Sequence, residues 1–213
     1  MLKKNDFVEI EYIGKIKNGE VFDTNIEEEA KKLGLEIKTK PLIICLGQNM
    51  ILPAIDNFII GKQLGTYTIE LEPEKAFGKR SQELVKTFSL NAFKHQNIVP
   101  KPGMVFAFDN LIGKITSISG GRVVVDFNNP LAGKIVEYKI TLKREIKDIN
   151  EKIKALLFFY TKKEFEFDIK DKKLTVYASQ TDSKLLKFFE KKFKEILDFD
   201  FEIKVKEIRQ EKK

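Results

Sequence analysis

The spacing of apolar residues predicts a strand, a polar link and a helix between residues 42 and 61. An apolar run extends from Leu42 to Leu46 and ends at Gly47. Apolar residues then recur at helical spacing, at Ile51, Leu52, Ile55 and Ile59. This spacing places them on one face of a helix, with Pro53 in its first turn and Gly61 at its end. We therefore predict a strand that leads into a helix whose apolar face lies on a sheet.

Alternation of apolar and polar residues predicts the strands of that sheet. Residues 7–14 and 21–24 read as strands, and Asn18-Gly19 between them is a strong signal for a tight hairpin turn. Residues 66–71 alternate in the same way. We expect a short surface helix at residues 26–33 and a returning strand at residues 131–140.

The segment between the strand at 66–71 and the returning strand is too long for a bare loop. It carries strand signals of its own at 84–88, 104–108, 113–118 and 122–127, and Ser89 can cap a helical turn that extends through Phe93. Ser119-Gly120-Gly121 separates the last two signals, which we expect to pair as a hairpin. The sequence thus predicts a small inserted β-domain.

From Asp148 onwards a third unit is expected, in the order α-β-β-α-β. A helix is predicted at 149–160, strands at 165–169 and 174–178, one helix at 182–197 and a last strand at 199–205. Such an order also occurs in RNA-binding KH modules, but no G-x-x-G loop joins two helices here. A sheet this small is marginal alone, so we expect a partner or a second copy of the chain to complete it.

Composition describes a folded protein without an obvious membrane span. Of the 213 residues, 42% are hydrophobic and 33% charged, and no apolar run reaches the roughly 18–20 residues that a membrane-spanning helix needs. The first residues lack the apolar segment of a secretory signal, so we expect a cytoplasmic protein. The net charge is +7, but lysines alternate with acids, as in Lys143-Arg144-Glu145. Interleaved charge is typical of a solvated surface, so nucleic acid is not the expected partner.

The chain has one cysteine and one histidine. Cys45 lies in an apolar strand, where a buried thiol behaves as a small hydrophobic group. His95 has no second histidine or cysteine at metal-ligand spacing. We expect neither an internal disulfide nor a metal site.

Several short motifs together resemble one family. In chain order they are Tyr12, Val21-Phe22-Asp23, Leu46-Gly47, Ile51-Leu52, Gly65 and Ala76-Phe77-Gly78. Their order and spacing are similar to the FKBP-type peptidyl-prolyl isomerases, in particular the SlyD-like subgroup and the long archaeal type with an inserted domain and a C-terminal domain. The residues 207–213 lack the histidines and cysteines of the metal-binding SlyD tail, so that property is not expected here.

The resemblance implies an α+β fold in three domains. Residues 1–80 and 131–147 would form an FKBP-like antiparallel sheet wrapped on a short helix, and residues 81–130 would form the inserted β-domain with chaperone activity. Residues 148–213 would form the C-terminal α-β-β-α-β domain, which we expect to pair two molecules into a homodimer.

The resemblance also implies the site. Its apolar wall would consist of Tyr12, Phe22, Leu42, Ile51, Leu52, Ile55, Phe77 and Tyr138, with Asp23 as the charged member. The backbone N–H of Ile51 could bind a substrate carbonyl. Ile55 stands where many relatives have a tryptophan, and Phe77 where they have a tyrosine. Phe22 and Tyr138 could be ordinary residues of the hydrophobic core. Asp23 is harder to explain as a core residue, because an unpaired buried carboxylate is costly.

An apolar cleft of this kind suits proline isomerisation. Rotation about an Xaa–Pro bond faces a barrier near 18–20 kcal/mol, and the twisted transition state is less polar than the planar amide. No catalytic triad, metal or other cofactor is needed. We expect a peptidyl-prolyl isomerase and folding chaperone that acts on unfolded or partly folded, proline-containing polypeptides. The alternatives are an FKBP-shaped chaperone or scaffold without turnover, and RNA or ribosome attachment through the basic C-terminal domain.

Five apolar residues of the insertion are candidates for binding unfolded chains, because a domain this small cannot bury all of them. They are Phe88, Phe93, Met104, Phe106 and Phe108. The alternative is that they form the core of the insertion.

Overall fold

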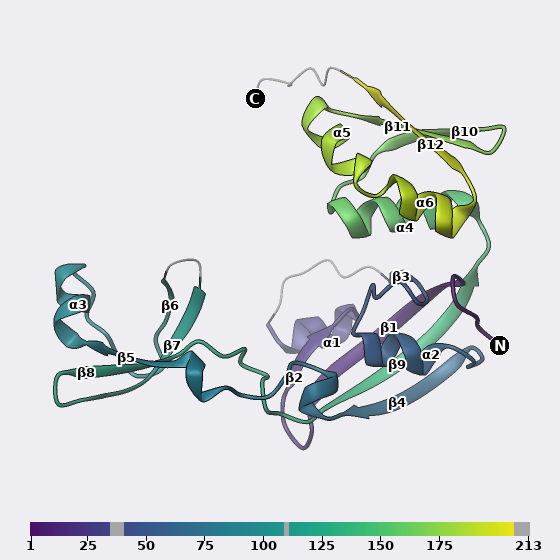
Figure 1. Ribbon diagram of the computed structural model, residues 1–213. Helices are drawn as coiled ribbons and strands as arrows, with labels where there is room; N and C mark the ends of the chain where they lie inside the picture. Colours follow the sequence, from purple (N-terminus) through teal and green to yellow (C-terminus); the bar gives the residue numbers. More distant parts are fainter. Residues whose placement is uncertain (35–40, 109–110, 207–213) are drawn as a thin grey trace. The chain divides into compact units, whose positions relative to one another are not determined.

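The computed structural model describes residues 1–34, 41–108 and 111–206 (Figure 1). The chain forms two compact units. The first comprises Met1–Ile13, Asp23–Ile69 and Tyr138–Lys213, and the second comprises Gly14–Phe22 and Glu70–Glu137. The fold is α+β, as predicted. The division into three domains at residues 80, 131 and 148 stays a prediction.

The first sheet has the order β2-β1-β9-β4, and β3 pairs with β1. Its strands are β1 (Phe7–Ile16), β2 (Val21–Thr24), β3 (Leu42–Cys45), β4 (Gly65–Leu71) and β9 (Val136–Ile146). The predicted hairpin is confirmed, and Asn18 in its turn has a left-handed φ of 56°. Strand β3 runs antiparallel to β1, with Cys45 opposite Phe7. Strand β9 begins and ends later than the predicted residues 131–140.

Two helices accompany this sheet in the sequence. Helix α1 (Glu27–Lys32) has glutamates in its first turn and lysines in its last, which suits the helix dipole. Helix α2 (Pro53–Ile59) begins at Pro53, as predicted, and buries Ile55 and Ile59. After α2 the chain turns at Gly61, whose φ is +85° and whose N–H donates to the carbonyl of Leu2 at 2.8 Å. The apolar spacing of the sequence therefore locates this helix correctly.

The insertion folds as a four-stranded sheet in the order β5-β8-β7-β6. Its elements are β5 (Val85–Ser89), α3 (Leu90–His95), β6 (Val105–Phe108), β7 (Leu111–Ser119) and β8 (Arg122–Asp126), and it follows two short 3-10 turns, Pro73–Lys75 and Gln82–Leu84. Gly120 and Gly121 both have positive φ, as a two-residue hairpin turn requires. The Ser89 hydroxyl accepts a hydrogen bond from the Asn91 N–H and caps α3. The predicted β-domain is confirmed in its elements.

The C-terminal segment contains one helix more than predicted. Its elements are α4 (Ile149–Thr161), β10 (Glu166–Lys170), β11 (Lys173–Ala178), α5 (Gln180–Lys187), α6 (Glu190–Leu197) and β12 (Asp200–Val205). Strand β11 lies in the middle of a three-stranded sheet, antiparallel to β10 and parallel to β12. The order is α-β-β-α-α-β, so the prediction of a single helix at 182–197 was wrong.

The break lies at two consecutive phenylalanines. The N–H groups of Phe188 and Phe189 donate to the carbonyls of Leu185 and Leu186, three residues back, which tightens the chain as a 3-10 turn does. Phe189 thereby stacks on Tyr160 of α4, with ring centroids 4.3 Å apart and an interplanar angle of 18°. We attribute the break to this stacking, which a helical periodicity read from sequence cannot anticipate.

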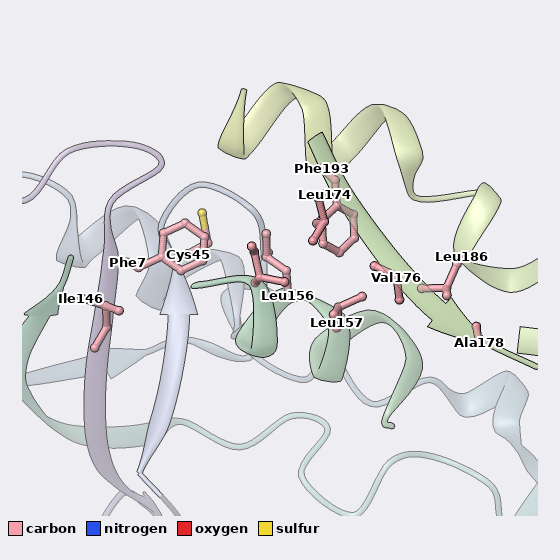
Figure 2. Close-up of a cluster of buried hydrophobic side chains, with 11 residues drawn as sticks. Phe7, Cys45, Ile146, Leu156, Leu157, Leu174, Val176, Ala178, Leu186 and Phe193 are labelled. Atoms are coloured by element: carbon pink, nitrogen blue, oxygen red, sulfur yellow. The ribbon is translucent and has the colours of Figure 1, made fainter. Parts of the chain in front are cut away.

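One hydrophobic core joins the first sheet to the C-terminal segment (Figure 2). The sheet contributes Phe7, Cys45 and Ile146, and the C-terminal segment contributes Ile153, Leu156, Leu157, Leu174, Val176, Ala178, Leu186 and Phe193. Helix α4 lies against strand β3. Residues on both sides of the predicted boundary at 147 and 148 are therefore buried together.

Polar contacts span the same junction. The Arg144 guanidinium bonds the carboxylates of Glu9 on β1, at 2.7 Å, and Glu151 on α4, at 2.6 Å. The Lys152 ammonium lies 5.4 Å from the centre of the Phe7 ring. Arg144 is about half exposed, and solvent-exposed ion pairs contribute little to stability. The apolar core is therefore the main connection.

Replacing Leu156 by alanine should weaken this junction. Leu156 is fully buried, so Leu156→Ala should lower the free energy of unfolding by roughly 2–5 kcal/mol. Cys45 is the only cysteine of the chain and reports on the junction directly. Burial and the charge of Asp56 raise the pKa of its thiol to about 12. A thiol reagent should therefore label wild-type Cys45 slowly and the Leu156→Ala variant faster.

Phe158→Ala is the matched control, because Phe158 lies on the same helix but is 50% exposed. Its labelling rate should equal that of the wild type. Equal labelling of Leu156→Ala and wild type would show that the core does not join the two parts.

Candidate functional site

Two tyrosines and one aspartate of the predicted site lie together in the first unit. Tyr12 is on β1, Asp23 on β2 and Tyr138 on β9. The Tyr12 hydroxyl donates to the carboxylate of Asp23, at 3.2 Å from Oδ2 and 3.3 Å from Oδ1. The rings of Tyr12 and Tyr138 are 6.2 Å apart at 49°. Tyr138 is buried and Asp23 is exposed, so the group extends from the core to the surface.

Asn25, which the sequence analysis missed, fixes the end of β2 against β1. Its Oδ1 accepts the N–H of Tyr12 at 2.7 Å, and its Nδ2 donates to the carbonyl of Ile10 at 2.8 Å. The Thr24 hydroxyl donates to the carbonyl of Tyr12 at 2.8 Å. The Asn25 amide thus replaces a backbone peptide in the strand pairing. The polar run Asp23-Thr24-Asn25 directly after a strand was the available signal.

Burial raises the pKa values of all three members of this group. Burial, and next the charge of Asp23, raise the pKa of Tyr12 to about 12. Burial and the same charge raise the pKa of Tyr138. Desolvation also raises the pKa of Asp23, against the opposing effect of hydrogen bonds from Tyr12 and the Thr24 N–H. Tyr12 therefore acts as a hydrogen-bond donor, and Asp23 is the acceptor.

The loop between β3 and α2 is held by a second residue that sequence reasoning missed, Asp56. Its carboxylate is buried, and its two oxygens accept the N–H groups of Gly47 and Asn49, both at 2.9 Å. Both residues have left-handed φ, at 79° and 54°. The sequence signal was a single acid between the apolar positions Ile55 and Ile59. This clamp fixes the loop that leads to Ile51.

The predicted apolar residues of the first unit lie on either side of this loop. Leu42 is the first residue of β3, Ile51 and Leu52 precede α2, and Ile55 lies within it. Ile55 is buried, and the other three are partly exposed. The Leu52 carbonyl accepts the N–H groups of Ile55 and Asp56, which starts the helix. Ile51 and Leu52 therefore have a fixed backbone next to the start of a helix.

Phe22 and Phe77 lie in the second unit and contact each other edge to face. Their ring centroids are 5.6 Å apart at 85°. Phe77 follows the short turn Pro73–Lys75, and the next residue, Gly78, has φ +80° and donates its N–H to the carbonyl of Pro73. We predicted that these two rings form one apolar wall with the residues of the first unit. That common role stays a prediction.

In the insertion, the predicted chaperone residues divide by burial. Phe93 is buried with Ile115, Val123 and Val125, which favours the alternative that it is core. Phe88 and Phe106 pack around it, and with Ala92 and Gln96 these rings line a hollow of about 150 Å³. Met104 is exposed, at 36%. The side chain of Phe108 lies outside the described residues.

Other apolar side chains of the insertion are more exposed than those that the sequence singled out. Val105 on β6 is 59% exposed, and Leu111 and Ile112 on β7 are 54% and 70% exposed. Strand β6 is an edge strand of its sheet. Alternation within the strands gave no signal for this surface, because each residue reads as an ordinary strand position.

The two segments that lead into and out of the insertion are tied together. The Arg80 guanidinium bonds the Asp126 carboxylate at 2.7 and 3.0 Å. The Asn128 side chain accepts the Ser81 N–H at 2.8 Å and donates to the Ser81 carbonyl at 2.9 Å. Burial alone would raise the pKa of Asp126, but hydrogen bonds from Asn128 and Arg80 outweigh it and lower the pKa.

Neither a metal cluster nor a membrane span is found in the part of the chain that the structure describes. No three histidine, cysteine, aspartate or glutamate side chains gather there to hold a metal ion. No helix within the same residues is both long and apolar enough to cross a membrane.

The raised pKa of Asp23 gives a stability prediction. A carboxyl whose folded-state pKa is raised stabilises the fold below its unfolded pKa of about 3.9, and this stability is lost as pH rises through the folded-state pKa. Asp23→Asn should therefore raise the melting temperature at pH 7, and the gain should vanish at pH 3. Asp126, whose pKa is lowered, is the control, since Asp126→Asn should lower the melting temperature at pH 7. A lower melting temperature for Asp23→Asn at pH 7 would contradict this account of the site.

Comparison with known proteins assigns these parts to one family. Residues 1–102 match a family model described as FKBP-type peptidyl-prolyl cis-trans isomerase, and residues 88–131 match one described as FKBP26, IF domain. The chain is 31% identical over 147 residues to the short-type peptidyl-prolyl cis-trans isomerase of Methanocaldococcus jannaschii, which covers 67% of this chain and 92% of the relative.

Two bacterial relatives carry names from the same family. The FKBP-type 16 kDa peptidyl-prolyl cis-trans isomerase of Escherichia coli is 31% identical over 122 residues, or 54% of this chain and 78% of the relative. The FKBP-type peptidyl-prolyl cis-trans isomerase SlyD of Treponema pallidum is 26% identical over 156 residues, or 71% of this chain and 82% of the relative. The chain therefore belongs to the FKBP-type peptidyl-prolyl cis-trans isomerases.

Proposed function

We propose that this isomerase acts on unfolded or partly folded polypeptides that it first captures on the insertion. The proposal rests on the presence of two features in one chain. The Tyr12, Asp23 and Tyr138 group lies in the first unit, and the exposed apolar residues of β6 and β7 lie in the insertion. We further propose that the protein is of the SlyD-like, long archaeal type.

The isomerisation itself requires no proton transfer. In the twisted transition state the amide has lost its resonance and part of its polarity, so apolar walls stabilise it relative to the hydrated ground state. Neutral tyrosine rings supply such walls, because a phenol with a pKa near 10 or above is uncharged at pH 7. The hydrogen bond to Asp23 holds the Tyr12 ring in one orientation.

A backbone donor orients the substrate. The N–H of Ile51 lies one residue before the N-cap of α2 and takes no part in the hydrogen bonds of that helix, so it can donate to a substrate carbonyl. We assign this role to Ile51, which directly precedes Leu52, the N-cap of α2. The Asp56 clamp on Gly47 and Asn49 keeps this backbone in place.

Capture uses the insertion. Val105 and Ile112 lie on one face of the paired strands β6 and β7, and Leu111 lies on the other. All three expose apolar area around the edge strand β6, which an unfolded chain can cover while it pairs with that strand as an extended peptide. A chain bound there stays close to the isomerase, which raises the effective concentration of its prolines. A short peptide gains nothing from this second contact.

The location and assembly of the protein are further proposals. We propose a cytoplasmic protein that pairs into a homodimer through residues 148–206. The exposed Phe188, at 81%, and the end strands β10 and β12 support a contact there. The outer face of this sheet carries ion pairs such as Glu166 with Lys206, so we expect pairing through edges rather than faces. The mass in solution tests the dimer.

The capture surface should matter for proteins and not for short peptides. In the double variant Leu111→Ser and Ile112→Ser, catalysis of proline-limited protein refolding should fall by at least about tenfold. Isomerisation of a proline tetrapeptide, followed by a protease-coupled assay, should stay within about twofold of the wild type, because the residues assigned to isomerisation are unchanged. Suppression of aggregation should fall in parallel.

Two controls complete this test. Phe158→Ser removes an apolar side chain outside the insertion that is about as exposed as Leu111, and it should change neither activity. Tyr12→Ala should lower both activities, because both use the same isomerase group. Equal losses on peptide and protein in the double variant would mean that the insertion shapes the isomerase itself, and no loss on protein would refute capture by this surface.

A further inference from the structure

The side chain of Met50 connects the isomerase loop to the core that the first sheet shares with the C-terminal segment. Met50 lies between the turn held by Asp56 and the proposed donor, Ile51. It packs against the cluster that contains Phe7, Cys45 and the residues of α4. Its sulfur accepts the N–H of Cys45 at 3.1 Å. The residue next to the proposed donor is thus anchored outside the predicted apolar wall.

Strand β3 shows the same division between its two faces. Leu42 belongs to the predicted wall, whereas its neighbour Ile43 packs against the shared cluster. Successive side chains of a strand point to opposite faces, so one side of β3 serves the wall and the other serves the junction. Cys45 lies on the same face as Ile43 and is fully buried. Helix α4 lies against this strand.

The loop therefore has two anchors of different kinds. Asp56 holds its first half by hydrogen bonds to the N–H groups of Gly47 and Asn49, within the isomerase fold. Met50 holds its second half by apolar contact with a core to which the C-terminal segment contributes Leu156 and Leu157. Three freely rotating side-chain bonds make methionine adaptable, so its position depends on the packing around it.

We propose that Met50 is a positioning residue through which the C-terminal segment sets the geometry of the Ile51 and Leu52 backbone. This inference rests on the proposed donor role of Ile51. The C-terminal segment is then a working part of the isomerase, not only an attachment for another molecule. A donor displaced by about 1 Å loses much of its effect on rate, so loosening this anchor costs turnover.

The test uses the full chain and three substitutions of Met50. Met50→Ala removes the anchor, and Met50→Gln keeps the length of the side chain but cannot stay in an apolar core without a penalty. Both should lower kcat for a proline tetrapeptide about tenfold with little change in KM. Met50→Leu keeps most of the apolar volume and should restore activity to within about twofold. Melting temperatures identify any variant that does not fold, and Met50→Gln then replaces Met50→Ala.

The route through the core is tested by a double variant. If Met50 acts through α4, Leu156→Ala should lower kcat in the same way, and the double variant with Met50→Ala should be no slower than the slower single variant. Phe158→Ala, on the exposed side of α4, should retain wild-type turnover.

Each outcome decides the inference. Wild-type turnover in both folded Met50→Ala and Met50→Gln would overturn it and leave the proposed function intact. Losses that multiply in the double variant would show that Met50 acts independently of the C-terminal segment and would also overturn it. An inactive wild-type protein would instead refute the proposed function.

Discussion

The burial of Phe7, Cys45 and Ile146 against helix α4 is the constraint on which the first unit depends. Phe7 and Cys45 lie opposite each other and face away from the side of the sheet on which Val8, Ile10 and Ile44 are buried. Without α4 this second face would expose apolar area to water, at a cost of about 25 cal/mol for each Å². The C-terminal segment, in turn, packs on the first sheet through helix α4, which lies against β3.

The site combines rigid polar contacts with apolar walls. The buried carboxylate of Asp56 and the partly buried amide of Asn25 accept backbone N–H groups and fix a loop and a strand end. The hydrogen bond from the Tyr12 hydroxyl to the Asp23 carboxylate holds the Tyr12 ring, which is part of the aromatic wall. Since proline isomerisation needs shape and low polarity rather than proton transfer, residues that only hold geometry matter as much as those that touch the substrate. Met50 belongs to this class, with apolar contacts beside the hydrogen bond that its sulfur accepts from the Cys45 N–H.

Local patterns in the sequence predicted most of the elements, and the resemblance located the family. Helix α2 followed from the spacing of Ile55 and Ile59, and both tight hairpins followed from Asn18-Gly19 and Gly120-Gly121. Local patterns could not predict the side chains that form hydrogen bonds with distant parts of the chain. Asn25, Asp56 and Asn128 read as ordinary polar loop or helix positions, and their roles depend on which backbone lies opposite them. The break at Phe188 and the shared core at Cys45 likewise depend on contacts with α4, more than a hundred residues from Cys45 in the second case.

The most direct test of this account is amide hydrogen exchange in residues 45–52, compared between the wild type and Leu156→Ala under conditions in which both are folded. The Cys45 N–H donates to the Met50 sulfur and the Asn49 N–H to the Asp56 carboxylate, so both amides are protected in the wild type. Loosening of the shared core should speed exchange at Cys45 and Asn49, while the strands of the insertion keep their wild-type rates. Unchanged exchange at Cys45 and Asn49 in the variant would contradict the claim that the C-terminal segment braces the isomerase loop.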